Sequence, residues 1–486
     1  YNTHMKNELF TSVAEALSEA HLNAFGHRPL LDAYETLAIA QPQFGDIGSN
    51  IAMQVASTHG MSPLEVAQKL IEGMGENDLI ESVDSVAPGF INIRLRSQSL
   101  LSPVTKIAHH WEEYVRALHT LGAGQTVAMD YSHPNIGKPM GVHHLLSTII
   151  GDSVKRILLS TGHTVIADNF LGDIGTQFGK LIWAVKQWGS EADIEQDPIT
   201  ELQKLYVRFH IEADGDVALD DAGREEYRKL EDGDKENRAL WHKIVQWSKA
   251  EIQPLYDELG VSFDYMHGES FYEDKMAPII QQGIELGLFV ESQGALVCLS
   301  DKPDDPPAII RKADGATLYI TRDLARIKYW EDTWQPDMML VIVDIAQNFA
   351  QRQLYSVAKK LQLSDAELTQ VNFGRMRFVD GAMSTRKGNI LLLKDLIAEV
   401  KQRSLVLAQE KSHGLSQTEL GELARVMGVG ALKYNILSQN RLSDITFSWD
   451  TMLSLEGNSA PYVMYTAVRA HSLLSKAAGA PESRDG

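Results

Sequence analysis

With 486 residues, the chain is too long for one hydrophobic core, so we expect two or three domains. Its hydrophobic fraction of 44% and charged fraction of 23% are ordinary for a globular protein. The net charge of −20 argues against a protein that coats nucleic acid nonspecifically, because neutralising phosphates needs a basic surface. It leaves room for recognition of one folded RNA by local basic patches.

The cysteine count and the length of the apolar runs limit the class of protein further. Cys298 is the only cysteine in the sequence, which excludes intramolecular disulfides and Cys-rich zinc sites. No apolar run approaches the roughly 20 residues needed to span a bilayer. We therefore expect a cytoplasmic protein without a membrane partner.

The first part of the chain, residues 6–98, is predicted to be a small α+β domain. An amphipathic helix is expected over residues 7–24. Ser62 followed by Pro63 has the pattern of an N-cap and the first residue of another helix. Residues 86–95 alternate apolar and polar side chains with a Pro-Gly turn, as a half-buried strand does.

A strand–loop–helix–strand pattern follows. Residues 127–132 resemble a short buried strand, and the loop after it is rich in proline and glycine. Apolar residues recur at helical spacing from about His143 until Gly162 ends the helix, and residues 164–167 form a second strand. This order predicts a parallel βαβ unit. The N–H groups and positive dipole end at the start of such a helix bind phosphate, so we expect a nucleotide there.

The middle of the chain is predicted to be mixed. Residues 180–259 have helical patterns with many carboxylates, which we interpret as a solvated face. Strands are expected at 308–312 and 317–320 around an Asp-Gly hairpin turn, with a helix over 322–331.

The last part begins with a buried strand. Residues 337–344 are almost continuously apolar, as a strand in a parallel sheet should be. From about Leu396 the pattern is helical, with breaks expected near Gly428 and Gly430.

Six segments stand out by their order and spacing. They are Phe44–Gln54, Asp130–Met140, Gly172–Gly179, Val371–Gly374, Met383–Asn389 and Gly457–Tyr462. With them the chain resembles the class I aminoacyl-tRNA synthetases, and most closely the arginyl-tRNA synthetases. The resemblance implies an α/β fold, in which a Rossmann-like parallel-sheet catalytic domain lies between an N-terminal α+β domain and a C-terminal helical region.

The resemblance also sets the expected domain limits. Residues 6–98 would be a domain of the kind that binds the tRNA elbow. Residues 122–395 would be the catalytic domain, with a helical insertion at about 180–260. Residues 396–486 would begin an anticodon-binding bundle. Family members usually continue for roughly a hundred residues more, the size of one further domain, so we expect this bundle to be incomplete.

A two-step reaction is implied as well. L-Arginine attacks the α-phosphorus of ATP, which is used with Mg2+, and the arginyl group then moves from the adenylate to the terminal ribose of tRNA(Arg). Such phosphoryl substitution needs positioning and charge neutralisation more than covalent help. The expected partners are tRNA(Arg), L-arginine and ATP, and we expect a monomer without zinc.

The family's His-Ile-Gly-His element aligns with the start of the helix after the first strand. His144 matches its second histidine and would donate to the α-phosphate, unless it is only a helix-start residue. Gly141 replaces the first histidine, and His143 replaces the glycine against which adenine lies. We expect both to contact ATP, together with Gly172 and Asp173 after the second strand. Asp173 could equally cap the next helix.

The family's second signature loop usually supplies two lysines to the β- and γ-phosphates. In this chain Ala382 and Thr385 stand at those positions. Arg386 and Lys387 keep positive charge in the loop, and Lys138 lies shortly before the first signature. We predict that these three cations share the charge of pyrophosphate; an ordinary basic surface turn is the alternative.

The same loop is expected to close over the nucleotide. Met383 and Ser384 are predicted to contact ATP, and the flanking Gly381 and Gly388 suit a loop that moves.

Arginine selection requires carboxylates, because a guanidinium is planar, permanently charged and best held by bidentate acceptors. The resemblance assigns this task to Glu269 and Asp323, with Tyr319 beside them. Asn135 and Gln347 match positions that orient the α-amino end of the substrate.

Most of these residues have a structural alternative. Asp323, in the first turn of a helix that Thr321 would cap, could serve only the helix dipole. Tyr319 could be a core strand residue, and Asn135 and Gln347 could only cap loops.

Two other interpretations stay open at this point. A synthetase-like protein that binds tRNA or arginine with impaired catalysis is favoured by Gly141 and His143, whereas the arginine pocket and the 383–388 loop favour an active arginine–tRNA ligase. An unrelated α/β nucleotide-binding protein would explain the βαβ unit but not the ordered set of motifs.

Overall fold

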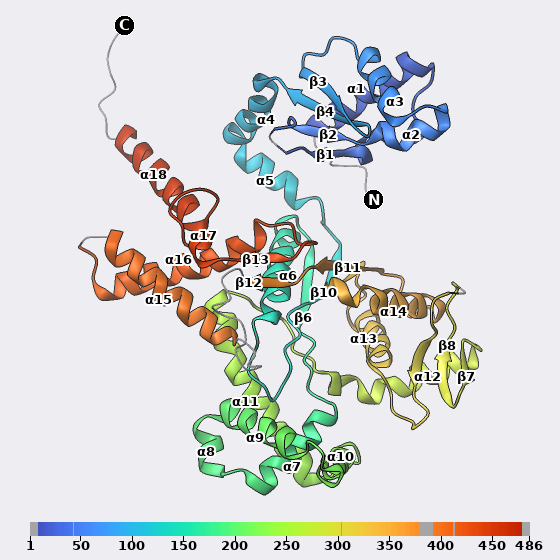
Figure 1. The fold of residues 1–486 in the computed structure, drawn as a ribbon, viewed down its shortest axis with the longest axis vertical. Helices are drawn as coiled ribbons and strands as arrows, with labels where there is room; N and C mark the ends of the chain where they lie inside the picture. The colour runs from blue at the N-terminus through green and yellow to red at the C-terminus, as the bar shows by residue number, and fades with distance from the viewer. Residues whose placement is uncertain (1–7, 42, 303, 379–391, 412–413, 479–486) are drawn as a thin grey trace. The chain divides into compact units, whose positions relative to one another are not determined.

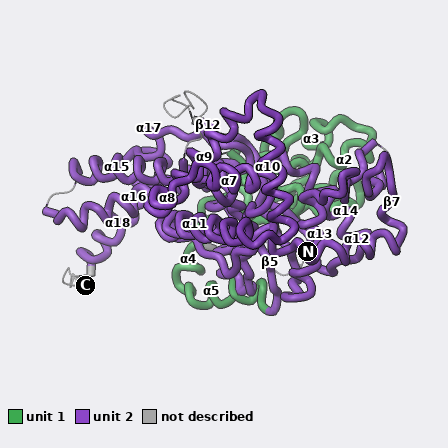
Figure 2. The backbone as a smooth tube through the Cα atoms, turned by 90° about the horizontal axis from the view of Figure 1, so that it is seen from below, with its two compact units in different colours: residues 1–123 green, residues 124–486 purple. Residues whose placement is uncertain are grey.

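The computed structural model describes residues 8–41, 43–302, 304–378, 392–411 and 414–478. The chain divides into two compact units, residues 1–123 and residues 124–486 (Figure 2). No helix among the described residues is long and apolar enough to cross a membrane.

The first unit is an α+β fold with a small antiparallel sheet of order β1-β2-β4-β3. Its elements are α1 (Glu8–Phe25), η1 (Ala33–Thr36), β1 (Leu37–Ile39), β2 (Ile47–Ser49), α2 (Ile51–His59), α3 (Pro63–Gly73), β3 (Ile80–Val86), β4 (Phe90–Leu95), α4 (Ser97–His109) and α5 (Trp111–His119). The predicted start of α3 is confirmed, since the Ser62 hydroxyl accepts the Glu65 N–H and the Glu65 carboxylate accepts the Ser62 N–H. The half-buried strand predicted after the Pro-Gly turn of residues 86–95 is confirmed as β4, and Val86 before the turn ends β3.

A parallel sheet organises the second unit (Figure 1). Its strands β5 (Thr126–Asp130), β6 (Thr164–Asp168), β10 (Met338–Asp344) and β11 (Glu367–Phe373) lie in the order β11-β10-β5-β6, and each neighbouring pair is parallel. The helix α6 (His143–Ser160) connects β5 to β6, so the predicted βαβ unit is confirmed. Parallel pairing brings the carboxyl ends of these strands to one edge, where open α/β sheets bind ligands.

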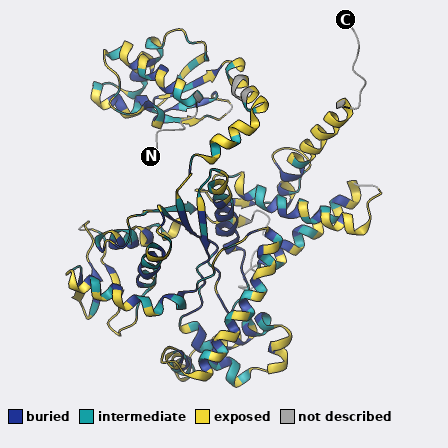
Figure 3. Ribbon diagram, turned by 180° about the vertical axis from the view of Figure 1, so that it is seen from behind, coloured by how far each residue is buried: buried dark blue, intermediate teal, exposed yellow. Residues whose placement is uncertain are grey.

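Side chains that alternate along β5 contact different helices on the two faces of the sheet. Val127 and Met129 of β5 join the core that contains α6, whereas Ala128 joins the core of α13 (Tyr319–Trp334) and α14 (Asn348–Lys360). Successive strand residues point to opposite faces, so both faces of β5 are covered. Figure 3 shows this buried sheet between helices whose outer faces are exposed. The expected fold class is therefore confirmed.

The remaining elements surround this sheet. Between β6 and α13 they are α7 (Thr176–Trp188), α8 (Glu191–Gln196), α9 (Pro198–Glu212), α10 (Val217–Glu231), α11 (Lys235–Leu259), η2 (Glu269–Lys275), α12 (Met276–Glu285), β7 (Phe289–Ser292), β8 (Ala295–Cys298) and β9 (Ala308–Arg311). After β10 they are η3 (Ile345–Gln347), β12 (Met376–Phe378), α15 (Leu393–Lys411), α16 (Gln417–Leu437), β13 (Ile445–Phe447), α17 (Trp449–Met452) and α18 (Ala460–Ala478). The helical region predicted at 180–259 is confirmed.

Two predictions about local structure are wrong. Residues 317–320 do not form a strand: after the hairpin turn Thr317 makes a single bridge to Arg311, and α13 begins at Tyr319. Gly428 and Gly430 do not break a helix, because both lie inside α16. A Cβ on Gly428 would come within 3.3 Å of the Val400 backbone of α15. That glycine therefore permits close helix packing.

The close packing of α6 on β5 generates a stability prediction. A Cβ at Gly151 would lie 2.3 Å from the fully buried Tyr131 ring. Overpacking of this kind costs about 1–3 kcal/mol, so Gly151→Ala should lower the free energy of unfolding by that amount in urea titrations. Gly421→Ala is the matched control, since Gly421 also lies in a helix but has open space around it. The control should be neutral or stabilising by up to about 1 kcal/mol. Equal effects would contradict the packing argument.

Candidate active site

Two loops meet at the carboxyl edge of the parallel sheet. The Ile136 N–H donates to the Gly172 carbonyl at 3.0 Å, and the Gly172 N–H donates to the Pro134 carbonyl at 3.0 Å. A Cβ on Gly172 would lie 2.9 Å from the Asn135 Oδ1, so the two residues are in close contact. The structure thus brings Asn135 and Gly172, both predicted site residues, side by side.

The turn that leaves β5 is held in an unusual conformation. Ser132 and His133 have φ values of 83° and 51°, which non-glycine residues rarely adopt. The Ser132 N–H donates to the Ser147 Oγ at 2.9 Å, and the His133 N–H to the Asn169 Oδ1 at 3.3 Å. Strain of this kind persists only where surrounding contacts fix it, and it is concentrated at functional sites.

Asp323 is held in place by a buried ion network. Its carboxylate lies 3.0 Å from the Arg326 Nη2, and Arg326 also pairs with Asp130 at the end of β5. Burial raises the pKa of Asp323, although Arg326 opposes this shift. Asp323 lies in the second turn of α13, and Leu318 is the N-cap. The expected first-turn position and the Thr321 cap are therefore wrong.

Glu269 begins η2, and Asp173 fixes the start of that segment. The Asp173 carboxylate accepts the Ser270 N–H at 2.9 Å and the Ser270 hydroxyl at 2.7 Å. Gly268 lets it approach, because a Cβ there would lie 1.9 Å from the Asp173 Oδ2. The side chain of Asp173 does not cap α7, whose N-cap is Gly175. Asp173 therefore positions the segment that carries Glu269.

The two predicted arginine-binding carboxylates share one electrostatic environment. Burial raises the pKa of Glu269 to about 7; Arg322 lowers it and the nearby charge of Asp323 raises it. The Arg322 Nη1 lies 3.4 Å from the Glu269 Oε2. The His133 Nδ1 lies 3.4 Å from the Asp130 Oδ1, and its Nε2 is 3.2 Å from the Ile342 carbonyl oxygen at the carboxyl end of β10. Glu269 and Asp323 are thus linked through Arg322, which pairs with the first and precedes the second on α13.

His144 lies at the start of α6, as predicted, and is buried. Its Nδ1 is 3.2 Å from the Gly141 carbonyl oxygen, to which an Nδ1–H donates. Burial, and secondarily His143, lower the pKa of His144 to about 3. A neutral ring with its proton on Nδ1 presents an acceptor at Nε2. His143 is exposed, and its ring centroid lies 3.9 Å from that of His144.

Other predicted side chains lie nearer the surface. Tyr319, the first residue of α13, is 68% exposed, so it is not a core strand residue. Asn135 and Gln347 are exposed at the carboxyl ends of β5 and β10. The Lys138 Nζ lies 4.4 Å from the centroid of the Tyr206 ring of α9, so the helical insertion holds this cation.

Four predicted residues of the second signature, Met383, Ser384, Arg386 and Lys387, lie outside the described residues. The chain around them is placed: β12 precedes the segment, and Leu392 after it forms a bridge with Gly141. The Leu393 N–H donates to the Met140 carbonyl at 2.8 Å. The described chain therefore resumes, at Leu392, beside the start of α6.

Sequence reasoning missed the ionic partners of the carboxylates. Asp130, Arg322 and Arg326 had no assigned role, although Asp130 directly ends a strand and both arginines flank Asp323 on α13. An arginine placed three residues after an acidic residue on a helix is a recognisable signal for an ion pair.

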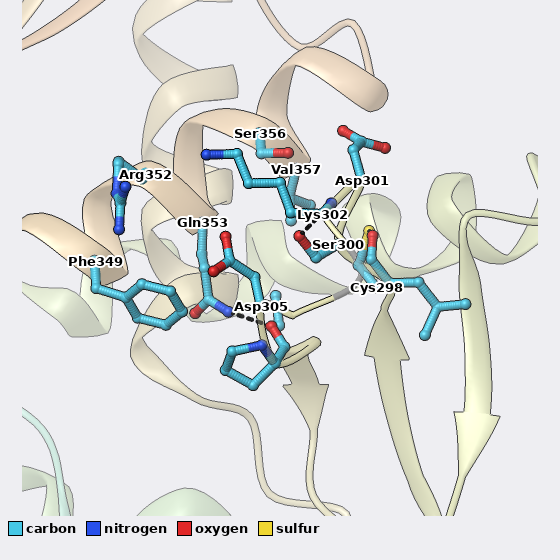
Figure 4. Close-up of a pocket in the computed structure, with 13 residues that line it drawn as sticks. Cys298, Ser300, Asp301, Lys302, Asp305, Phe349, Arg352, Gln353, Ser356 and Val357 are labelled. Carbon is cyan, nitrogen blue, oxygen red and sulfur yellow. Dashed lines mark hydrogen bonds between the residues drawn. The ribbon is translucent and has the colours of Figure 1, made fainter.

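A separate pocket lies between α14 and the chain that follows β8 (Figure 4). It has a volume of about 180 Å³, and Phe349, Arg352 and Gln353 line one side. Within the described residues, none of the predicted site residues lines it. The described part of the chain likewise contains no group of three or more His, Cys, Asp or Glu side chains that could hold a metal.

The carboxyl edge of this sheet, with the start of α6 beside it, has the arrangement of a class I aminoacyl-tRNA synthetase. The family model described as tRNA synthetases class I (R), catalytic domain, matches residues 107–449, and that described as arginyl tRNA synthetase N terminal domain matches residues 7–95. The chain therefore belongs to the arginyl-tRNA synthetase family.

Individual proteins similar to this chain support the same family. An arginine–tRNA ligase of Fusobacterium nucleatum is 38% identical over 457 residues, which cover 94% of this chain and 79% of that protein. Arginine–tRNA ligase 2 of Bacillus anthracis is 38% identical over 468 residues, covering 96% and 82%. The solved arginyl-tRNA synthetases of Plasmodium falciparum and Thermus thermophilus share the fold, each with a TM-score of 0.69, at 24% and 22% identity. They cover 98% of this chain, which in turn covers 82% and 84% of theirs.

The environment of His144 predicts its protonation. Because its pKa is lowered to about 3, 15N NMR of the imidazole should show a neutral ring from pH 7.5 down to 5. In urea the same side chain should titrate near its ordinary value of about 6.5. Below about pH 6.5 the unfolded chain therefore binds a proton at His144, whereas the folded chain does not. His144 should thus reduce the free energy of unfolding as pH falls below about 6.5. A ring half protonated near pH 6 in the folded protein would contradict this account.

Proposed function

We propose that this chain activates L-arginine with ATP and joins it to tRNA(Arg) at the carboxyl edge of the β11-β10-β5-β6 sheet. The observation that carries the proposal is the 3.4 Å contact between Arg322 of α13 and Glu269 of η2, which brings the carboxylate of Glu269 to the part of α13 that carries Asp323. Membership in the arginyl-tRNA synthetase family supports arginine–tRNA ligase activity. A binding protein with impaired catalysis is not favoured.

Arginine would bind with its guanidinium against Glu269 and Asp323. A guanidinium offers a planar fork of N–H donors to two carboxylates, which a lysine ammonium cannot reproduce. Asn135 and Gln347 would orient the α-amino end, and their exposure at the same sheet edge supports this role. Tyr319 would lie beside the guanidinium as a surface residue.

ATP would place its triphosphate at the start of α6, near Gly141, His143, Gly172 and Asp173, where the positive end of the helix dipole favours anions. His144 can donate from Nε2 only when that nitrogen carries a proton, and a nearby phosphate charge would favour this form. Mg2+ would enter with the phosphates, since it usually retains water and binds phosphate oxygens.

Charge neutralisation would complete the first step. The arginine carboxylate attacks the α-phosphorus, and the bond to pyrophosphate breaks. Lys138, Arg386 and Lys387 would share the charge of pyrophosphate, with Met383 and Ser384 against the nucleotide. In the second step the terminal ribose of tRNA(Arg) takes the arginyl group as an ester and releases AMP.

The same proposal assigns the domains. Residues 6–98 would bind the tRNA elbow, residues 122–395 would catalyse, and residues 396–486 would belong to an anticodon-binding bundle. A compact first unit that ends at residue 123, and an N-terminal domain match over residues 7–95, support this division. A cytoplasmic monomer is the proposed working form.

Exchange of labelled pyrophosphate into ATP tests the function. With tRNA(Arg) present, we expect exchange that depends on L-arginine and is absent with L-lysine. No exchange, together with arginine binding measured by calorimetry, would contradict the ligase and favour a binding protein.

Asp323 generates the sharpest prediction for substrate selection. Asp323→Ala should weaken arginine binding by about 3 kcal/mol or more, over a hundredfold, because it removes one partner of a buried ion pair. ATP binding should stay nearly unchanged. Asp332→Ala is the matched control, since Asp332 lies on the same helix, exposed and paired with Lys328. Calorimetry that shows unchanged arginine affinity for Asp323→Ala would refute the assignment.

A further inference from the structure

Arg322 is a nearly buried cation without a role in the site described so far. It lies on α13 directly before Asp323, and its Nη1 is 3.4 Å from the Glu269 Oε2. The two side chains are only 11% and 10% exposed. Within the described part of the chain, neither the Glu269 Oε2 nor the Arg322 Nε has a hydrogen-bond partner. Buried polar atoms are rarely left unpaired, and those that are often await a ligand.

The charges around Glu269 show why Arg322 matters. Four charged side chains face this carboxyl: Arg322, Asp323 and Arg326 of α13, and Asp173 before α7. The two carboxylates disfavour its ionisation, and burial disfavours it further. Of the two guanidiniums Arg322 has the larger effect.

The other guanidinium is already engaged. Arg326 pairs with Asp130 and Asp323, so it has little capacity left for Glu269. Arg322 also lowers the pKa of Glu273, one turn further along η2. Arg238 lowers that pKa as well, and Glu231 raises it. Arg322 is therefore the main positive charge available to Glu269 before a substrate binds.

We propose that Arg322 is a positioning residue for arginine selection, which favours the ionised form of Glu269 in the empty site so that this carboxylate can accept the guanidinium of the substrate. The inference rests on the proposed function of Glu269 and deepens it. A neutral carboxyl would offer one O–H donor to a group that has only donors, and would lose most of its attraction for the guanidinium. A substrate would then have to drive the ionisation itself, which weakens binding.

This role has a pH signature. The pKa of Glu269 is raised to about 7 even with Arg322 present, so arginine affinity should rise as pH increases through about 7. A nearby opposite charge shifts a carboxyl pKa by about 1–3 units. Without Arg322 the same rise in affinity should therefore occur at higher pH.

The test compares Arg322→Met with Arg322→Lys in pyrophosphate exchange, measured from pH 6.5 to 8.5. Arg322→Met should raise KM for arginine roughly fivefold or more at pH 7, and this ratio should shrink several-fold by pH 8.5. The KM for ATP and kcat should change little, and Arg322→Lys should restore most of the affinity. Lys328→Met is the control, because it removes an exposed positive charge from the same helix.

Several results would overturn the proposal: an unchanged KM, an increase of KM that is equal at every pH, or no rescue by lysine. Arg322→Gln replaces Arg322→Met if circular dichroism shows that the latter is unfolded. Glu269→Gln distinguishes the proposed role of Glu269 from that of Arg322. If it leaves arginine binding intact, the proposed function of Glu269 fails; if it weakens binding equally at every pH, that function stands and only Arg322 is in question.

Discussion

The buried guanidinium of Arg326 joins the parallel sheet to the helix that carries half of the proposed arginine site. Arg326 pairs with Asp130 at the end of β5 and with Asp323 on its own helix. Its guanidinium carbon also lies 4.6 Å from the centroid of the Phe170 ring and 5.2 Å from that of Trp330. Buried charges are tolerated only when paired, so this contact fixes where α13 sits on the sheet and where Asp323 points.

The neighbouring strand repeats the arrangement with another carboxylate. Asp168 ends β6 and lies in register with Asp130 of β5. It accepts the His267 backbone N–H at 3.1 Å, the Tyr272 hydroxyl at 3.2 Å and the Trp330 Nε1–H at 3.2 Å. The Asp168 carboxylate therefore binds both α13 and η2 at the same sheet edge, and Glu269 is the first residue of η2. The site is assembled by the acids that end the strands.

Much of the fold follows from local sequence patterns. The apolar run of β10 and the helical spacing of α6 need only nearest neighbours to be recognised, and both are where they were expected. Residues 317–320 were wrongly predicted as a strand because a short apolar run of this length does not separate a strand from the start of a helix. Gly428 misled because glycine also permits two helices to approach closely, and only the tertiary structure shows that α15 lies there.

The site could be predicted only in part, for a similar reason. Family spacing points to Glu269 and Asp323, and Arg326 follows Asp323 by three residues, but Asp130 lies far along the chain from Arg326 and Glu269 lies far from Arg322. Asp130 and Arg326 are 196 positions apart, and no local pattern relates them. The tautomer of His144 likewise depends on burial and on the Gly141 carbonyl, which the motif alone does not reveal.

The central claim is that one sheet edge brings a guanidinium slot next to a triphosphate site. A crystal structure with L-arginine and a non-hydrolysable ATP analogue tests it most directly. We expect the guanidinium within about 3 Å of carboxylate oxygens of both Glu269 and Asp323, with the phosphates at the start of α6. An arginine bound away from these carboxylates, or phosphates far from His144, would contradict the account.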